Sequence, residues 1–376
     1  MTKYVLISAG ETSGDIHASN LIKNLKEFSP GVRFFGIGGE RMEAAGVDMV
    51  KRMDNLSIIG VTGILSNLKH LNHAFKGLVK KAKTLSPALA ILIDYPGFNL
   101  ILAKRLKKIG IPVVYYITPQ VWAWGGWRIR TIKKYVDKAV VILRFEEELF
   151  KKHGIDASFV GHPLLDREAK TLRAGGSLGL DKEKFTVALL PGSRKSEVLR
   201  MLPVMLKTAE IISRKKDTQF VLLKSSGVSE NIYETLLKKT SVKVTVVKDD
   251  TCGCLSLSDF VFTSSGTATL ESAIMEKPML ITYKTSFLTA LLFKTVARTR
   301  FIGLVNIIAG KEIAPELLQY DARPERLASS ILSIISSRKK LDRQVQELRQ
   351  VKTLLGTSGA SRRAARIISD FIKQQR

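Results

Sequence analysis

Residues 4–15 have the sequence YVLISAGETSGD, a short apolar run followed at once by a glycine-rich turn. The run from Tyr4 to Ser8 contains the β-branched and apolar residues that favour a buried strand. Gly10 and Gly14 permit a tight turn and a close approach of the backbone to a ligand. Many α/β proteins have such a turn without a ligand, so taken alone it fits a structural role as well.

Similar apolar runs recur along the chain and alternate with amphipathic stretches. We predict strands at 4–8, 32–36, 89–94, 113–117, 139–143, 158–161, 186–190, 220–223, 242–247, 259–263 and 279–282. Strands that alternate with helices predict parallel sheets covered on both faces. A glycine-rich stretch, 172–179, separates two such series. The sequence therefore predicts an α/β protein with two doubly wound domains facing a cleft.

The predicted boundaries follow from this division. We expect an N-terminal domain over residues 1–170, a C-terminal domain over 171–355, and a basic helix over 356–376 that packs back on the N-terminal domain. The chain has 376 residues, 45% of them hydrophobic and 25% charged, which suits two globular domains.

Net charge narrows the range of partners. Lys and Arg number 60 against 34 Asp and Glu, a net charge of +26. The positive electrostatic potential of such a chain favours binding of nucleic acid, an anionic membrane surface or a phosphorylated substrate. We expect no nucleic acid, because the basic residues neither interleave with aromatic residues nor follow a known binding signature.

Short sequence patterns indicate the cellular compartment of the protein and whether it binds a metal or cofactor. Cys252 and Cys254 are the only cysteines, too few for a zinc site, and we expect idle thiols in a reducing compartment. The apolar run 4–9 is too short for a secretory signal. No uncharged run reaches the roughly 18 to 20 residues that span a bilayer. We therefore expect a cytoplasmic protein, and no metal or cofactor.

Two loops of the second half suit a diphosphate. Residues 190–194, LPGSR, follow a predicted strand and precede a helix, so backbone N–H groups, the Ser193 hydroxyl and the Arg194 guanidinium converge at a positive helix end. Residues 263–271, TSSGTATLE, repeat the strand, loop and helix order. Glu271 is placed to accept hydrogen bonds from a ribose. The alternative is that these Ser and Thr residues only cap helices.

Taken in order along the chain, these motifs resemble the lipid-A-disaccharide synthase family. The matched positions are 9–15, 36–39 with Met42 and Gly46, Ile93-Asp94 with Phe98-Asn99, 119–124, Phe145-Glu146, 161–164 with Asp166, 190–194 with Glu197, 265–271, Lys277-Pro278 with Tyr283, Asn306, and 315–319. Any one of these matches could arise by chance, but the ordered set is specific to the family.

The resemblance implies an inverting glycosyltransferase of GT-B architecture, with two Rossmann-like domains, that acts in lipopolysaccharide biosynthesis. It implies transfer of 2,3-diacylglucosamine from UDP to the 6-hydroxyl of 2,3-diacylglucosamine 1-phosphate. The products are the β-1,6-linked lipid A disaccharide 1-phosphate and UDP. The substrates are thus UDP-diacylglucosamine and diacylglucosamine 1-phosphate, and a homodimer is left open.

Site residues follow from the matched motifs. We expect Asp94, at the end of an apolar strand, to be the catalytic base, its pKa raised by burial; a turn-capping role is the alternative. The residues expected to bind UDP are Ser193, Arg194, Ser265, Gly266, Thr267, Glu271, Asn306 and Gln319. Those expected to line the acceptor side of the cleft are Glu11, Ser13, Asp15, Trp122, Trp124 and His162. For His162, fixing the crossover between domains is an equal alternative.

Four positions depart from the family pattern. Gly97 stands where a second acid is usual, Gly63 where a Glu is usual, Gly125 where an Arg follows Trp-Ala-Trp, and Arg144 where a Pro precedes Phe145. These departures keep two alternatives open: another UDP-sugar enzyme of GT-B architecture, such as a 2-epimerase, and a catalytically weakened lipid-binding relative.

Two segments predict contact with a membrane. From Ile64 to Val79, apolar residues recur at helical spacing with lysines between them, and 286–308 is apolar but punctuated by basic residues. Core packing is the alternative for each. Together with the charge and an acylated substrate, they favour a peripheral protein on an anionic membrane, on the inner face of the inner membrane.

Overall fold

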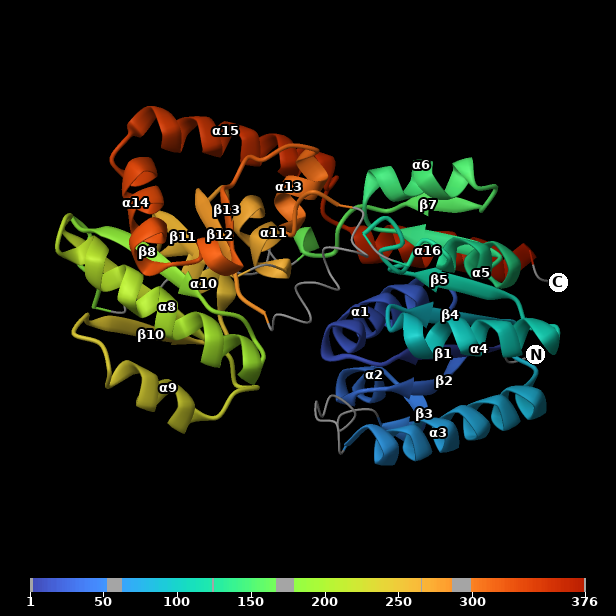
Figure 1. Cartoon of the computed structure of the whole chain (residues 1–376). Coiled ribbons are helices and arrows are strands. Elements are labelled where there is room, and N and C mark those ends of the chain that lie inside the picture. The colour runs from blue at the N-terminus through green and yellow to red at the C-terminus, as the bar shows by residue number, and fades with distance from the viewer. Residues whose placement is uncertain are drawn as a thin grey trace. The chain divides into compact units, whose positions relative to one another are not determined.

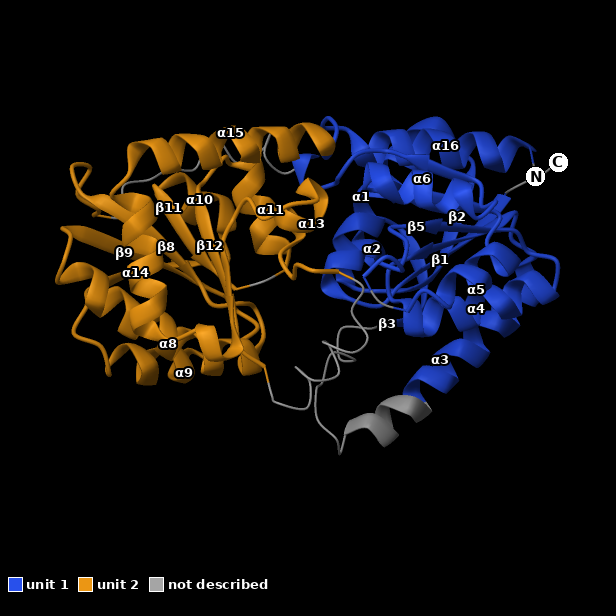
Figure 2. Cartoon of the chain, turned by 45° about the horizontal axis from the view of Figure 1, so that its top comes forward, with its two compact units in different colours: residues 1–166, 355–376 blue, residues 167–354 orange. Residues whose placement is uncertain are grey.

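The computed structural model of the chain describes residues 3–52, 63–123, 125–166, 179–264, 266–285 and 299–374, with the backbone alone for 63–69. The chain divides into two compact units (Figure 2). Unit 1 comprises Met1–Asp166 and Leu355–Arg376, and unit 2 comprises Arg167–Leu354. The chain thus leaves unit 1 after Asp166 and returns to it at Leu355.

Unit 1 contains a seven-stranded parallel sheet in the order β3-β2-β1-β4-β5-β6-β7 (Figure 1). Its strands are β1 (Lys3–Ala9), β2 (Val32–Gly38), β3 (Val47–Arg52), β4 (Leu89–Ile93), β5 (Val113–Tyr116), β6 (Lys138–Val141) and β7 (Ala157–Phe159). The central strands β1, β4 and β5 are almost entirely buried, as expected for strands with helices on both faces.

Helices cover both faces of this sheet and bury two hydrophobic cores. One core involves α3 (Gly63–Leu85), α4 (Pro96–Lys108), α5 (Arg128–Tyr135) and α6 (Arg144–Lys152). The other involves α1 (Thr12–Phe28), α2 (Glu40–Ala44) and α16 (Ala360–Gln374). The C-terminal helix α16 packs along α1, where the Ser369 and Ser29 hydroxyls are 2.8 Å apart.

Unit 2 contains a six-stranded parallel sheet in the order β10-β9-β8-β11-β12-β13. Its strands are β8 (Phe185–Leu190), β9 (Thr218–Lys224), β10 (Val244–Lys248), β11 (Phe260–Thr263), β12 (Met279–Tyr283) and β13 (Glu316–Leu318). One face packs on α8 (Lys195–Ser213), α9 (Glu230–Leu237) and α14 (Pro324–Ile335). The other packs on α10 (Thr251–Ser256), α11 (Thr267–Ile274), α13 (Leu304–Ala309) and α15 (Arg338–Leu354); a 3-10 turn, η1, spans Gln319–Asp321.

The two parallel sheets confirm the predicted fold class, and the structure adds two strands to the prediction. β3 and β13 lie at sheet edges, and neither has the long apolar run of a central strand. β3 has the sequence VDMVKR and is only partly buried, while β13 has three residues. An edge strand buries less surface, so its sequence carries a weaker hydrophobic signal.

The strand order reverses direction once in each sheet. In unit 1 this point lies between β1 and β4, where Ala9 pairs with Ile93. In unit 2 it lies between β8 and β11, where Leu190 pairs with Thr263. Ligands of doubly wound proteins bind beyond the carboxyl ends of the strands at such switch points. In each unit a site is therefore expected beyond the carboxyl ends of the strands at the switch point.

Candidate functional site

Asp94 lies at the switch point of unit 1, directly after β4. It and Tyr95 have positive φ angles of 46° and 49°, a conformation that costs free energy in residues other than glycine. Such strain persists only where the surroundings enforce it, and it is concentrated at functional sites.

Hydrogen bonds hold this turn in place. The Asp94 carbonyl oxygen accepts hydrogen bonds from the Tyr115 hydroxyl at 2.7 Å and from Asn99 Nδ2 at 2.8 Å. The buried Asn99 side chain also accepts a hydrogen bond from the Ser8 hydroxyl of β1 at 2.7 Å. The backbone of Asp94 is thus fixed by side chains of α4 and β5, and through Asn99 by β1.

The environment of the Asp94 carboxylate suits a base. Burial raises the pKa of Asp94 from 3.8 to about 6, and the Glu11 carboxylate adds to the rise. Glu11 is exposed in the turn after β1, and Ser13 is exposed in the first turn of α1. The Tyr95 ring lies against Gly10, where a Cβ atom would come within 2.2 Å of it. Gly10 is therefore needed for the turns after β1 and β4 to pack together.

Asp15, which was predicted to line the acceptor side of the cleft, makes structural hydrogen bonds. Its carboxylate accepts three backbone N–H hydrogen bonds, from Gly39 at 2.9 Å, Met42 at 3.0 Å and Arg41 at 3.1 Å. These donors form the N-terminus of α2, where a carboxylate satisfies the free amides and the positive helix end. Asp15 therefore joins α1 to α2.

Trp122 lies in the loop after β5 and is tied to α6. Its Nε1 donates a hydrogen bond to Oε1 of the buried Glu146 at 2.9 Å, and its ring meets Phe145 edge-on at 5.2 Å. Burial raises the pKa of Glu146 from 4.5 to about 7, while the Trp122 hydrogen bond opposes the rise. Trp124 lies outside the described residues.

His162 occupies the segment where the chain passes between the units. Its backbone N–H donates to Leu355 O at 2.9 Å, and its Nδ1 accepts from the Leu164 N–H at 3.2 Å. Burial lowers the pKa of His162 to about 3, so the ring is neutral near pH 7. Nearby, the Asp166 carboxylate accepts N–H hydrogen bonds from Gly359, Ala360 and Ser361 at the start of α16. These contacts favour the crossover role of His162.

Arg194 and Ser193 lie beyond β8, at the switch point of unit 2. Both backbone N–H groups donate to Glu197 Oε2, at 3.2 and 3.1 Å, and the Arg194 side chain is 60% exposed. Gly192 has φ 111°, and a Cβ atom there would lie 2.5 Å from Glu197. The Glu197 carboxylate thus occupies amides that were predicted to bind a diphosphate. The guanidinium stays accessible from solvent.

The neighbouring loop, after β11, leaves its helix end more open. Gly266, with φ 116°, is the N-cap of α11 and has no side chain that could accept from the helix N–H groups, while its carbonyl oxygen accepts from the Thr269 hydroxyl at 2.8 Å. The first turn of α11 contains no acid, and Thr267 is exposed. Glu271 is half-buried on the same helix. This geometry speaks against capping as the role of Thr267 and leaves the helix end able to accept an anion. Ser265 lies outside the described residues.

Asn306 and Gln319 have different surroundings. The buried Asn306 carboxamide donates to Ala314 O and Glu316 Oε1 and accepts from the Ile313 and Ala314 N–H groups, at 2.7 to 3.0 Å. Its hydrogen-bonding capacity is used within the fold. The side chain therefore has a structural role, and its contact with the nucleotide stays a prediction. Gln319 is half-buried after β13, has φ 51°, and accepts a hydrogen bond from the Thr285 N–H at 3.2 Å.

The structure shows the surroundings of three of the four positions that depart from the family pattern. A Cβ atom at Gly97, in the first turn of α4, would meet nothing within 4 Å. Gly125 has φ 75° and lies against the Arg128 side chain. Arg144 begins α6, with its guanidinium 5.1 Å from the Phe159 ring centroid. Gly63 begins α3, where the side chains are not described.

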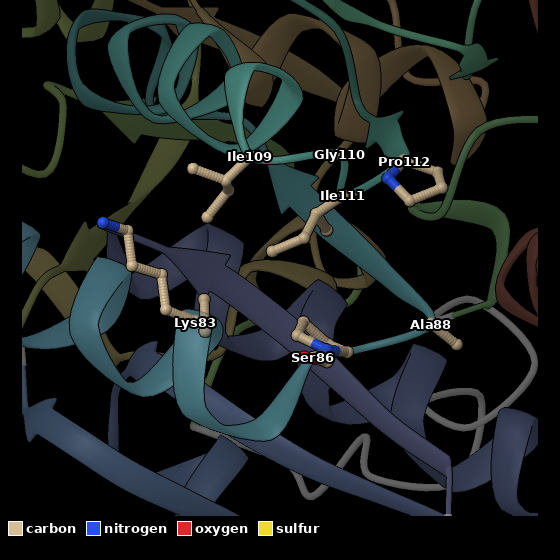
Figure 3. A pocket seen from close by; sticks show the side chains of 9 residues that line it. Lys83, Ser86, Ala88, Ile109, Gly110, Ile111 and Pro112 are labelled. Atoms are coloured by element: carbon tan, nitrogen blue, oxygen red, sulfur yellow. The ribbon is translucent and has the colours of Figure 1, made fainter.

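Several residues that shape the site had no role in the sequence prediction. They are Tyr95, Asn99, Tyr115 and Glu146. Asn99 and Glu146 belong to matched motifs, so an unexplained polar residue in a motif was the available signal. A separate pocket of about 510 Å³ lies at the opposite edge of the unit 1 sheet, before β4 and β5, with Lys83, Ser86 and 109–112 in its lining (Figure 3).

Comparisons with known proteins agree on one family. A sequence model of the lipid-A-disaccharide synthetase family matches residues 5–369. The lipid-A-disaccharide synthase of Syntrophus aciditrophicus is 43% identical over 378 residues, which cover 99% of each chain. That of Geobacter sulfurreducens is 38% identical and covers 99% of this chain and 98% of its own.

Solved structures with low sequence identity share the fold. UDP-GlcNAc 2-epimerase from Neisseria meningitidis is 12% identical with a TM-score of 0.59, and covers 99% of this chain and all of its own. The calicheamicin glycosyltransferase CalG4 is also 12% identical, with a TM-score of 0.64 and 99% coverage of both chains. No described helix is long and apolar enough to cross a bilayer. The chain belongs to the lipid-A-disaccharide synthase family, a family of glycosyltransferases with GT-B architecture.

Proposed function

We propose that this chain transfers 2,3-diacylglucosamine from UDP to the 6-hydroxyl of 2,3-diacylglucosamine 1-phosphate in lipopolysaccharide biosynthesis. The bond from the anomeric carbon to the diphosphate breaks, and a β-1,6 bond to the acceptor oxygen forms with inversion. UDP leaves with the electron pair of the broken bond. Family membership over nearly the whole chain supports this reaction.

The position of Asp94 is the observation that carries the mechanism. The acceptor hydroxyl must lose a proton as it attacks, and a base is most effective with a pKa near the working pH. Burial brings the pKa of Asp94 to about 6, so it is ionised near pH 7 yet basic enough to take a proton. Its carbonyl oxygen is held by Asn99 of α4 and Tyr115 of β5, which fixes the backbone from which the carboxylate projects.

For the leaving group, we propose that Arg194 and the N-terminus of α11 stabilise the diphosphate. Arg194 is exposed and can contact two phosphate oxygens at once. Gly266 and Thr267 contribute backbone N–H groups at a positive helix end. Ser193, Ser265, Glu271 and Gln319 complete the proposed nucleotide pocket, whereas Asn306 supports it from within the fold.

On the acceptor side, we propose that Glu11, Ser13, Trp122 and Trp124 contact the acylated glucosamine phosphate. Both substrates carry acyl chains, and the chain has a net charge of +26. These two facts support peripheral attachment to an anionic membrane, on the inner face of the inner membrane.

Release of UDP tests the proposal. Wild-type protein is incubated with UDP-diacylglucosamine and diacylglucosamine 1-phosphate in detergent, and UDP is measured. We expect release that needs both substrates and that falls on the order of 10²- to 10⁴-fold in Asp94→Ala. Asp156→Ala, at an exposed acid before β7, is the matched control and keeps full activity. No release from wild type defeats the synthase reaction, while full release from Asp94→Ala defeats only the assignment of the base.

A further inference from the structure

Charge is distributed unevenly over the two helical layers of unit 1. The helices α3, α4, α5 and α6, which share one hydrophobic core, contain sixteen Lys and Arg and three Asp and Glu, and all three acids belong to α6. The helices of the opposite layer, α1, α2 and α16, contain seven Lys and Arg and five Asp and Glu. The excess of positive charge in unit 1 is therefore concentrated on one side of its sheet.

Among the described side chains of unit 1, the two most exposed large apolar ones lie in the same layer. Trp127 is 67% exposed and Ile101 is 61% exposed; the described part of unit 1 has no other large apolar residue in the exposed class. Trp127 precedes α5, and Ile101 lies in the second turn of α4. The two helices pack side by side (Figure 1). Large apolar side chains exposed on neighbouring helices indicate an interaction surface.

Helical spacing places the basic residues on the same surface as these two side chains. On α4, Lys104 and Lys108 follow Ile101 by three and seven positions, and on α5, Arg130 and Lys134 follow Trp127 by the same intervals. All four cations are exposed, and within the described residues none of them forms an ion pair. Lys107, by contrast, is paired with Asp137. We call Ile101, Lys104, Lys108, Trp127, Arg130 and Lys134 the α4–α5 face.

We propose that the α4–α5 face docks on a bilayer that contains anionic lipid. Lys and Arg near an anionic membrane are attracted to it, and Trp prefers the boundary between headgroups and acyl chains. A folded nucleic acid or an acidic protein surface offers the cations a partner, but offers no apolar phase for Ile101 and Trp127. A bilayer satisfies both parts of the face at once.

The position of the α4–α5 face relative to Asp94 also supports docking on a bilayer. This step rests on the proposed function. α4 begins two residues after Asp94, so its N-terminal turns lie at the carboxyl ends of the strands, where Asp94 also lies. The N-terminus of α5 lies at the same end of the sheet, because α5 follows β5. Ile101 and Trp127 are both near these helix starts. Docking would therefore bring the end of the sheet with Asp94 to the lipid that supplies the acylated acceptor.

Vesicle sedimentation tests the proposal on the full chain. The probes are vesicles of phosphatidylcholine alone and of phosphatidylcholine mixed with phosphatidylglycerol. Each basic residue near the surface contributes about 1 kcal/mol, so K104E/R130E should bind the mixed vesicles at least ~10-fold more weakly than wild type. The matched control, K23E/R366E, removes the same charge from exposed positions of the opposite layer and should bind within about twofold of wild type. Equal losses in both variants, or equal wild-type binding to both vesicles, overturn the proposal.

Quenching of tryptophan fluorescence by brominated acyl chains tests whether the apolar part enters the bilayer. We expect quenching in wild type and its loss in Trp127→Phe, with sedimentation retained because phenylalanine keeps an apolar ring. Undiminished quenching in Trp127→Phe overturns the insertion of this residue. RNA that competes with vesicles and leaves wild type unquenched would point to a nucleic-acid surface instead, and would overturn the proposal.

Activity with substrates dispersed in detergent separates this inference from the proposed function. K104E/R130E should release UDP at the wild-type rate in detergent and more slowly when the acceptor is embedded in mixed vesicles. If wild type shows no release in detergent, the proposed function fails regardless of vesicle binding. If K104E/R130E matches wild type on vesicles as well, the docking face is wrong and the reaction stands.

Discussion

Trp122 Nε1 donates a hydrogen bond to Glu146 Oε1 at 2.9 Å, and this links the loop after β5 to the first turn of α6. Glu146 is 2% exposed, and its other oxygen accepts from the Leu143 N–H at 3.3 Å. A buried carboxylate without a cationic partner is costly when ionised. Among its contacts in the described part of the chain are two N–H donors, which still leave its pKa raised to about 7.

The raised pKa of Glu146 predicts how the stability of the protein depends on pH. The folded state holds the proton up to about pH 7, whereas the unfolded state releases it near 4.5. The contribution of this group is therefore full below pH 4.5 and is lost as the pH rises through 7, up to about 3 kcal/mol in all. Glu146→Gln should remove this decline in stability, so that the unfolding free energy of the mutant rises relative to that of wild type between pH 5 and 8.

Thermal unfolding of the full chain as a function of pH measures this effect. Glu148→Gln, at an exposed acid of the same helix with no such burial, is the control and should follow the wild-type curve. A constant difference in unfolding free energy between Glu146→Gln and wild type across this range would show that Glu146 does not titrate as the structure indicates.

Much of this architecture could be predicted from the sequence, because the central strands are long apolar runs. Strands such as 89–93 and 260–263 are buried on both faces and leave a continuous hydrophobic signal. Edge strands β3 and β13 left no such signal. The turn after each central strand could be recognised as a candidate site because ligands of doubly wound sheets bind there.

The roles of single polar residues could not be predicted in the same way. Asp15 and Asn306 both occur in matched motifs, but their partners, the N-terminus of α2 and the 313–316 segment, come from folding of the surrounding chain. A carboxylate that caps a helix and one that binds substrate look alike in a sequence. Only the hydrogen-bond partners separate the two.

Gly97→Asp should restore a second acid near Asp94 without harming the fold. A Cβ atom at this position meets nothing within 4 Å. An acid in the first turn of α4 favours the helix, so stability should rise by about 0.5 to 1 kcal/mol. A like charge raises the pKa of Asp94, which should move the acidic limb of the rate profile from about pH 6 to higher pH, by roughly 1 unit.

The rate of UDP release against pH measures this shift, with Gly97→Ser as the uncharged control. Serine also replaces the glycine but adds no charge, so its profile should coincide with that of wild type. A shift of equal size in Gly97→Ser would mean that the helix geometry, and not the added charge, acts on the base.

Arg194→Ala should weaken binding of the UDP-sugar with little effect on stability. A charge-assisted hydrogen bond is worth about 1.5 to 3 kcal/mol, so kcat/KM for the UDP-sugar should fall by about 10- to 100-fold. Its ion pair with Glu197, at 3.6 Å, is exposed and contributes little to folding. Arg214→Ala, at the opposite end of α8, is the control and should keep the wild-type kinetics. An unchanged kcat/KM in Arg194→Ala would remove this residue from the proposed pocket.

Asn306→Ala distinguishes a structural role from direct contact with the nucleotide. Loss of the carboxamide leaves the Ile313 and Ala314 N–H groups and the Ala314 carbonyl without their buried partner, which should cost roughly 2 to 4 kcal/mol of unfolding free energy. At a temperature where the mutant stays folded, KM for the UDP-sugar should lie within about twofold of wild type, since a side chain saturated inside the fold has no donor left for the ligand. Asn231→Ala, at an exposed position of α9, should change neither quantity. A large rise in KM at unchanged stability would instead restore Asn306 to the nucleotide pocket.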